Sequence, residues 1–382
     1  MLTKIILEEE LIVGEPLPWN IYGIDNELLL HQGYVLGSKR QKEVLLSRGV
    51  FRESADEELA VDGVEEQSSN HSSVECPFFI LDTLKVNLKG ILTDITNSVV
   101  GDYNHKITKL ADNIQRLCNE NSDPALGAMH LDQNSPYTNV HPILCAILTE
   151  LLIRRQNIPP KDRLLYISAA LTQNIGMLEL QQQLSNQTEK LTDAQRKAIR
   201  DHPHKSKEML QSVGIDHKEW LDTVLHHHER PDGSGYPLGL KGKEISMQAK
   251  ILSVADIYSA MILPRNYRDA FNVKKALKDI FLQRGKLVDE KTSHLLIKEI
   301  GIYPPGTFVK LVNGDIAIVI KRATENVHSP LVLSIMCSKG DLFETPKERE
   351  TLEKEDYAIK EVVHNIGNIR IYQDEIWDIN NP

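Results

Sequence analysis

Residues 218–237 read KEWLDTVLHHHERPDGSGYP. Apolar residues recur at helical spacing in the first half, so we expect a helix from Lys218 to His228. The second half contains two glycines and two prolines and predicts a tight turn. The triplet His226, His227 and His228 therefore lies where a helix ends and a turn begins.

Helical periodicity extends on both sides of this segment, from about residue 77 to residue 300. Thr192 and Gln195 have the spacing of a capping box at one helix start. This pattern predicts a mainly α protein. Further helices are expected at residues 78–99, 107–117, 141–153, 163–171, 193–200, 247–262 and 273–282.

Polar residues interrupt several of these apolar helices. Asp256 lies in a run that is apolar almost all round and should be buried. A buried carboxylate is costly without a partner, so Asp256 needs a cation, strong donors or a metal. His141 opens another apolar helix, and His202 precedes Pro203 where we expect two helices to join. One such histidine is typical of a helix cap or a hydrogen-bonded core residue, and a His triplet can be surface composition. Imidazoles and a carboxylate together are the ligands of a Zn, Mn or Fe site.

The N-terminal part of the chain differs from the helical middle. Residues 1–51 alternate apolar and polar residues around a turn at Asp25–Asn26, followed by a short helix at 38–46. They predict a small α+β module. Residues 52–76 hold eight acidic residues against one basic residue, which predicts an acidic flexible linker.

The C-terminal part, residues 301–382, predicts a small β-rich module. Asn313–Gly314 separates two apolar runs, and this dipeptide is a strong hairpin signal. Strands are expected at 308–311, 316–320 and 331–336.

Composition excludes several classes of protein. The chain has 382 residues, which is enough for two or three domains, and its net charge of −10 argues against a DNA or RNA partner. Four scattered cysteines without a CxxC pair predict neither a disulfide framework nor a thiolate zinc site. We find no signal peptide and no apolar run of the roughly 20 residues that a membrane span needs. These features predict a cytoplasmic location.

The run from His227 to Pro237 matches the pattern HHExxDGxGYP and so resembles the signature of the HD-GYP family. Members of this branch of the HD phosphohydrolases are bacterial phosphodiesterases that open cyclic di-GMP to pGpG or GMP. The resemblance covers about residues 135–300. It implies an all-helical HD-type domain over residues 133–300, after a helical connecting segment over residues 77–132.

The resemblance also implies a metal site, since the family holds two or three metals, usually iron or manganese. The matching ligand positions are His141, His202, His227, His228 and Asp256.

The motif that names the family is altered in this chain. The pattern HDxGK corresponds to QNIGM, so that Gln173, Asn174 and Met177 replace its histidine, aspartate and lysine. Ser259 and Tyr137 stand where family members have a second aspartate and, in one subgroup, a glutamate. Without the bridging aspartate two cations would repel each other.

We therefore expect at most one divalent transition metal, Fe, Mn or Zn, or none. His202, His227 and His228 are its expected ligands, because three imidazoles can hold one such ion. His141 and Asp256 form a weaker pair that we expect to be empty.

Substrate-binding features are better preserved. By the resemblance, Arg265 and Arg268 grip phosphates, which suits the forked guanidinium. Gly235, Tyr236 and Pro237 shape the pocket mouth, and Ser259 is a further candidate on the substrate side.

These features favour a degenerate HD-GYP protein of cyclic di-GMP signalling. It would act as a nucleotide receptor or as an interaction module, with the GYP loop as a surface for protein partners, and with weak or no hydrolysis. The alternative is an active metal-dependent phosphodiesterase with a reduced metal site. A hydrolase for another substrate and a purely structural scaffold also remain open.

Overall fold

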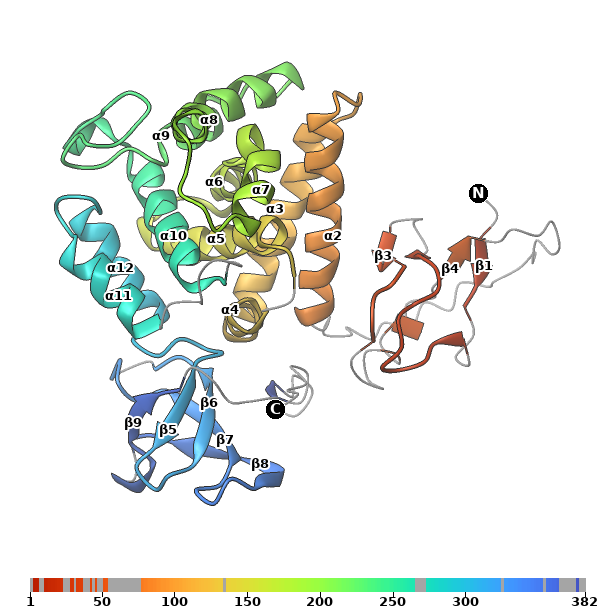
Figure 1. The fold of residues 1–382 in the computed structure, drawn as a ribbon, viewed down its shortest axis with the longest axis vertical. Helices are drawn as coiled ribbons and strands as arrows, with labels where there is room; N and C mark the ends of the chain where they lie inside the picture. The colour runs from red at the N-terminus through yellow and green to blue at the C-terminus, as the bar shows by residue number, and fades with distance from the viewer. Residues whose placement is uncertain are drawn as a thin grey trace. The chain divides into compact units, whose positions relative to one another are not determined.

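The computed structural model describes most of the chain between residues 77 and 363, together with short stretches near both ends. The described residues are 3–6, 10–22, 28–30, 32–36, 42, 45–46, 51–53, 77–132, 135–264, 273–323, 326–352, 355–363 and 376–377. The chain divides into two compact units, one of residues 1–87 with 370–382 and one of residues 88–369 (Figure 1).

The first unit contains a four-stranded sheet in the order β1-β4-β2-β3. Its strands are β1 (Thr3–Ile5), β2 (Ile21–Tyr22), β3 (Leu28–Leu30) and β4 (Phe51–Glu53). β2 and β3 pair antiparallel, so the expected hairpin is confirmed, although its turn at Asp25–Asn26 lies outside the described residues. Leu17, Ile21 and Leu30 belong to a small apolar core beside this sheet.

The start of the predicted acidic linker differs from the structure. β4 pairs antiparallel with β1 and extends two residues into the segment 52–76. The pairing joins residues about 50 positions apart in the chain, which local composition does not reveal. Residues 54–76 and most of the helix expected at 38–46 lie outside the described residues.

The second unit has a helical part, and the helices expected from periodicity are confirmed. The helix that leads into it, α2, spans Pro77–Thr96. The others are α3 (Tyr103–Glu120), α4 (Ser122–Leu131), α5 (Tyr137–Ile153), α6 (Pro160–Thr172), α7 (Leu178–Asn186), α8 (Asp193–Ser212), α9 (Lys218–His226), α10 (Met247–Ile262), α11 (Val273–Leu282) and α12 (Glu290–Ile300). The sequence did not predict α4, α7 and α12, and α7 has no buried residue that would give a periodic apolar stripe. Among the described helices, none is both long and apolar enough to cross a membrane.

α5 and α10 lie at the centre of the helical part and pack against each other. Every residue of α5 from Val140 to Ile153 is buried, and α10 buries residues on most of its circumference. A helix that is apolar all round is buried because no face of it suits water. The prediction that Asp256 is buried is confirmed.

The expected join between two helices at His202–Pro203 is wrong, because α8 runs without a break from Asp193 to Ser212. Proline has no backbone N–H, so Pro203 cannot donate to the carbonyl of Ile199 four residues earlier. The ring of His202 donates to this carbonyl instead, with Nδ1 2.6 Å from the oxygen. The side chain therefore satisfies the carbonyl that the proline leaves unpaired.

The rest of the second unit is an antiparallel sheet in the order β8-β7-β6-β5-β9, as Figure 1 shows in blue. Its strands are β5 (Phe308–Leu311), β6 (Ile316–Lys321), β7 (Leu331–Met336), β8 (Leu342–Glu350) and β9 (Ile359–Val362). The β5–β6 hairpin at Asn313–Gly314 and the β-rich character are confirmed. The sequence did not predict β8, because this edge strand is charged and mostly exposed.

The sheet is attached to the helices by close backbone contact and by charge. Gly306 has a φ of 85°, and a Cβ there would lie 2.7 Å from the carbonyl oxygen of Gly127 in α4. Arg322 at the end of β6 forms an ion pair with Asp123 and donates to the carbonyl of Glu299 at 3.1 Å. These contacts fix the start of the sheet against α4 and α12.

Candidate metal centre

The position of the expected catalytic pair is a tight turn between α6 and α7. Gln173 and Asn174 are both buried there. Gly176 lets the turn approach α8, because a Cβ on it would lie 2.6 Å from the backbone nitrogen of Ser206 and 2.7 Å from the carbonyl oxygen of His202. Ser206 Oγ accepts from Gly176 N at 2.9 Å and donates to the Gln173 carbonyl at 2.8 Å. The turn is therefore fixed beside His202.

Two backbone carbonyls orient two histidine rings in the same way. His202 Nδ1 lies 2.6 Å from the Ile199 carbonyl, and His227 Nδ1 lies 2.6 Å from the Val224 carbonyl at the end of α9. A carbonyl only accepts hydrogen bonds, so each Nδ1 carries the proton. Each neutral ring then presents a lone pair at Nε2.

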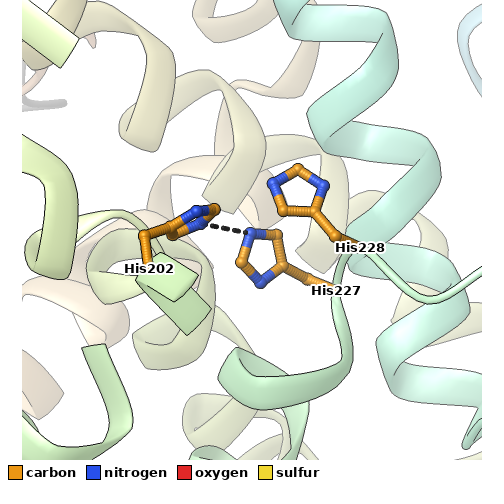
Figure 2. Close-up of side chains that lie close together, drawn as sticks. All are labelled: His202, His227 and His228. Atoms are coloured by element: carbon orange, nitrogen blue, oxygen red, sulfur yellow. Dashed lines mark hydrogen bonds between the residues drawn. The ribbon is translucent and has the colours of Figure 1, made fainter. Parts of the chain in front are cut away.

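These two lone pairs face each other. The Nε2 atoms of His202 and His227 are 3.3 Å apart, as the dashed line in Figure 2 marks, and neither has a proton to share. Two nitrogens bound at 2.0–2.1 Å to one tetrahedral ion would be about 3.4 Å apart. His228 is the third member of this histidine cluster, and one ligand atom from each ring lies within 4.8 Å of the others. The arrangement fits a metal ion bound by three imidazoles.

Burial keeps the histidine cluster uncharged. Burial, together with the neighbouring His227, lowers the pKa of His202 to about 3. The pKa of His227 is also lowered by burial, and the pKa of His228 is well below its usual value because of burial and of the neighbouring His227, since two adjacent rings cannot both take up a proton easily. Neutral imidazole is the form that binds metal, so the cluster is ready to bind a cation at neutral pH.

A second group of potential ligands lies where α5 and α10 meet. It contains His141, Asp256 and a residue that the sequence did not single out, Cys145. His141 Nε2 lies 3.3 Å from Asp256 Oδ1, and Cys145 Sγ lies 3.7 Å from the same nitrogen. All three residues are buried. Cys145 follows His141 by four residues, and this spacing places both side chains on one helix face. The spacing was therefore the sequence signal that could have identified Cys145 as a potential ligand.

Asp256 links the two groups. It accepts a hydrogen bond from Gln173 Nε2 at 3.3 Å, and its other oxygen lies 4.0 Å from His228 Nδ1. Burial opposes ionisation of Asp256, but the hydrogen bond from His141 and the nearby imidazoles hold its pKa below the usual value. The structure therefore supplies the partners that the sequence required for this carboxylate.

A pocket of about 220 Å³ opens onto both groups. His228, His141 and Asp256 form its polar floor, together with Asn174. Its apolar walls come from Tyr137, Met177, Leu184, Ile199, Tyr236 and Ala260. The guanidinium of Arg200 lies over the Tyr236 ring, 5.1 Å from its centroid.

The sequence matches the HD domain family over residues 109–292. This matched segment, just under half of the chain, is similar to an HD domain and is called the HD domain below. It is 30% identical over 225 residues to a cyclic di-GMP phosphodiesterase of Pseudomonas aeruginosa, a match that covers 58% of this chain and 54% of the relative. It is 32% identical over 174 residues to 3'3'-cGAMP-specific phosphodiesterase 3 of Vibrio cholerae, covering 46% of this chain and 38% of the relative. The chain thus spans about half the length of these curated relatives, or less.

Among solved structures, the chain resembles Bd1817, a HDG"Y"P protein from Bdellovibrio bacteriovorus, with a TM-score of 0.53 and 16% identity. The alignment covers 77% of this chain and 98% of that chain. The shared fold confirms the HD-type helical core, and the family match together with the phosphodiesterase relatives confirms the resemblance that the sequence motif indicated.

The loop after α9 in the HD domain is held by a residue that the sequence reasoning missed. Glu229 is buried, and its carboxylate accepts hydrogen bonds from the backbone N–H groups of Leu238 at 2.6 Å, Gly239 at 3.1 Å and Leu240 at 2.9 Å. The sequence feature that could have identified Glu229 is its position directly after a histidine pair and before a glycine-rich loop. Glu229 thereby places Tyr236 beside the histidine cluster. The ring centroids of Tyr236 and His228 are 4.8 Å apart.

The other predicted substrate-binding residues do not all lie at the pocket. Gly235 allows the loop to fold back onto residues 228–230, just after α9, since a Cβ on it would lie 2.4 Å from Arg230 N. Pro237 follows Tyr236 in the same loop, while Ser259 is fully buried and is not among the residues that line the pocket. Arg265 and Arg268 lie outside the described residues.

Proposed function

We propose that this HD domain binds a cyclic dinucleotide of the cyclic di-GMP class and hydrolyses it weakly or not at all. The proposal follows from the chemistry of one turn. Gln173 presents an amide, which donates a hydrogen bond to Asp256, where the family pattern has a metal-binding histidine. The adjacent Asn174 presents a neutral amide oxygen rather than a carboxylate.

Neutral amides weaken the catalytic machinery more than the binding surface. A bridging carboxylate holds two cations close together, and an amide oxygen lacks the charge to do so. Met177 lines the pocket where the family pattern has a lysine, so a cation that would stabilise phosphate charge is missing from this wall. These changes reduce hydrolysis and leave the pocket open.

One divalent ion of the Fe, Mn or Zn type suits His202, His227 and His228. When bound, such an ion supplies Lewis acidity toward a phosphate oxygen. Tyr236 contributes an aromatic face at the pocket, against which a base or a sugar packs. Arg200 lies over that ring and brings a positive charge toward the phosphate.

The pocket has the size of part of a nucleotide. Its volume of about 220 Å³ is below the roughly 300–1,000 Å³ typical of sites that enclose a whole ligand. We propose that it takes one phosphodiester with its sugar, and that Arg265 and Arg268 contact the rest. We further propose that the same loop, on which Leu238 is exposed, contacts a protein partner, and that the protein acts in cytoplasmic signalling.

An active phosphodiesterase with a reduced metal site is the second candidate. It is favoured by the histidine cluster, because three imidazoles leave a coordination position for water, as in catalytic zinc sites. Buried Asp256 beside this cluster would help to hold the ion in place.

Calorimetry and turnover measured on the same protein distinguish the two candidates. We expect cyclic di-GMP or 3'3'-cGAMP to bind with micromolar affinity. Tyr236→Ala and Arg265→Ala should each weaken binding at least about tenfold. The control Arg284→Ala, remote in sequence from the pocket loop, should leave binding unchanged. Turnover is measured anaerobically with Fe(II) and with Mn(II). Binding without turnover supports the receptor. Rapid turnover favours the phosphodiesterase, and a lack of binding to both nucleotides contradicts the proposal.

A further inference from the structure

Cys145 lies in the group with His141 and Asp256, in a position suited to metal binding. Its Sγ is 3.7 Å from His141 Nε2 and 3.8 Å from Nδ1. A zinc-type ion with bonds of about 2.3 Å to sulfur and 2.0–2.1 Å to nitrogen would hold these two atoms about 3.6 Å apart. The 3.3 Å between His141 Nε2 and Asp256 Oδ1 is also close to the separation of about 3.4 Å on such an ion.

Buried polar atoms without partners surround the same group. Gln173 is fully buried, and its Oε1 has no hydrogen-bond partner among the described residues, although its Nε2 is bound to Asp256. Ser259 Oγ, one turn beyond Asp256 on α10, is also buried without a described partner. A buried acceptor left unpaired costs about 1–3 kcal/mol, so such atoms usually mark a missing ion or water. The amide oxygen of Gln173 is thus an independent sign that a cation belongs here.

The charges of this group suit a dication better than those of the histidine cluster do. A thiolate and a carboxylate together neutralise a doubly charged ion, whereas three neutral imidazoles do not. The altered catalytic pair has lost one carboxylate, because Asn174 carries no charge. Cys145 restores an anionic ligand from a different helix, α5.

We propose that His141, Cys145 and Asp256 bind a divalent transition metal through one imidazole, one thiolate and one carboxylate, with zinc favoured over manganese. On binding, the S–H bond of Cys145 breaks, its proton passes to solvent and a sulfur–metal bond forms. His141 Nε2, which donates a hydrogen bond to Asp256 in the metal-free protein, also gives up its proton to solvent and binds the ion through the freed lone pair. The thiolate selects a softer ion, since oxygen-rich sites suit manganese. This site replaces the expectation from the sequence of no thiolate site and of at most one ion. It does not depend on nucleotide binding.

Cobalt(II) substitution of the full-length protein tests the site, because a thiolate bound to Co(II) gives an intense charge-transfer band in the near ultraviolet. We expect two Co(II) per chain and this band in the parent. Cys145→Ser should keep one Co(II) at the histidine cluster and lose the band. Cys118→Ser is the matched control, since Cys118 is also buried and burial raises the pKa of its thiol, which keeps it protonated. Cys337→Ser controls for the more accessible thiol.

Selectivity and proton release give a second readout. Zn(II) should displace Mn(II) from the parent about tenfold more readily than from Cys145→Ser or Cys145→Ala, with about one additional proton released per chain in the parent. A parent without the band, a band that persists in both Cys145 variants, or a band that disappears in Cys118→Ser would overturn the proposal. If the Cys145 variants do not fold, the band and the metal content of the parent decide.

Discussion

The two groups of ligands in this HD domain differ in how they are built and in how they satisfy themselves without metal. The histidine cluster consists of three neutral rings from α8 and the end of α9, and two of its nitrogens face each other with no proton between them. In the group of His141, Cys145 and Asp256, the carboxylate already has His141 and Gln173 as partners. The first cluster is therefore incomplete without an ion, whereas the second is partly satisfied by the protein itself.

The difference shows that two kinds of contact prepare these ligands. Backbone carbonyls hold the histidine rings in place, whereas side chains stabilise the buried carboxylate when no metal is bound. At the histidine cluster, backbone carbonyls fix the rings because Pro203 and a helix end leave those carbonyls without backbone donors. At the second group, the cost of burying Asp256 is offset by neighbouring side chains. Four experiments challenge or refine this distinction.

Removing a ring from the histidine cluster should have the largest effect. His202→Ala is expected to lower the affinity of that cluster for Zn(II) more than about 100-fold, since even the loss of a residue that only supports a ligand costs 10–100-fold. The matched control is His226→Ala, which alters the same histidine triplet at a half-buried position outside the cluster. Competition with a chelator measures both affinities. Equal losses in the two variants would mean that the cluster is not the site.

Rebuilding the altered motif should change activity next most strongly. Gln173→His, Asn174→Asp and Met177→Lys together restore the charged pair and the lysine beside the histidine cluster. We expect hydrolysis of cyclic di-GMP to rise about 100-fold over the parent, which is within the range for a positioned catalytic group. Product formation is followed chromatographically, with Met177→Lys alone as the control. A parent as fast as the triple variant would refute the argument from the neutral amides.

Weakening the loop beside the histidine cluster should reduce stability. Glu229→Gln turns one acceptor oxygen into an NH₂ group that faces a backbone N–H, and should cost about 3 kcal/mol in the free energy of unfolding. Glu244→Gln is the control, because this exposed carboxylate accepts from one backbone N–H only and should cost less than about 0.5 kcal/mol. Urea unfolding measures both. Similar losses would show that the three bonds of Glu229 do not hold the loop.

The smallest expected effect concerns His130, a half-buried histidine outside both groups of ligands. His130 Nδ1 lies 2.7 Å from the Pro305 carbonyl and its Nε2 lies 3.2 Å from the Tyr258 hydroxyl, so protein groups satisfy both nitrogens. Burial lowers the pKa of His130 to about 4, although the Pro305 carbonyl acts in the opposite direction. The unfolded chain, with a pKa of about 6.5, takes up the proton first, so stability falls as the pH drops from 6.5 toward 4.

Between pH 8 and pH 5, His130 should account for about 2 kcal/mol of lost stability. Urea unfolding of metal-free protein at both pH values should show this extra loss in the parent and not in His130→Gln. His204→Gln, at an exposed position of α8, should behave as the parent does. A parent and a His130→Gln variant with the same pH dependence would contradict the assignment.

Several features of the HD domain could be predicted because they depend on neighbours in sequence. The bounds of α10 and α11 follow from apolar periodicity, the Thr192–Gln195 capping box depends on three-residue spacing, and the burial of Asp256 follows from the apolar run around it. The prediction of a helix break at Pro203 was wrong because the compensating donor is a side chain, which a rule for the proline backbone does not include.

The sequence alone determined the helical class of the central domain and the β-rich end of the chain, because helix periodicity and hairpin signals are local properties. It grouped His202 with His227 and His228 only through the resemblance to a family. Only the tertiary structure decided that Cys145 joins His141 and Asp256, and that Gln173 donates to Asp256 across 83 residues. The physical reason is that α5, α6 and α10 meet through the burial of apolar faces. Burial fixes which polar atoms are enclosed together, and no spacing along the chain specifies that.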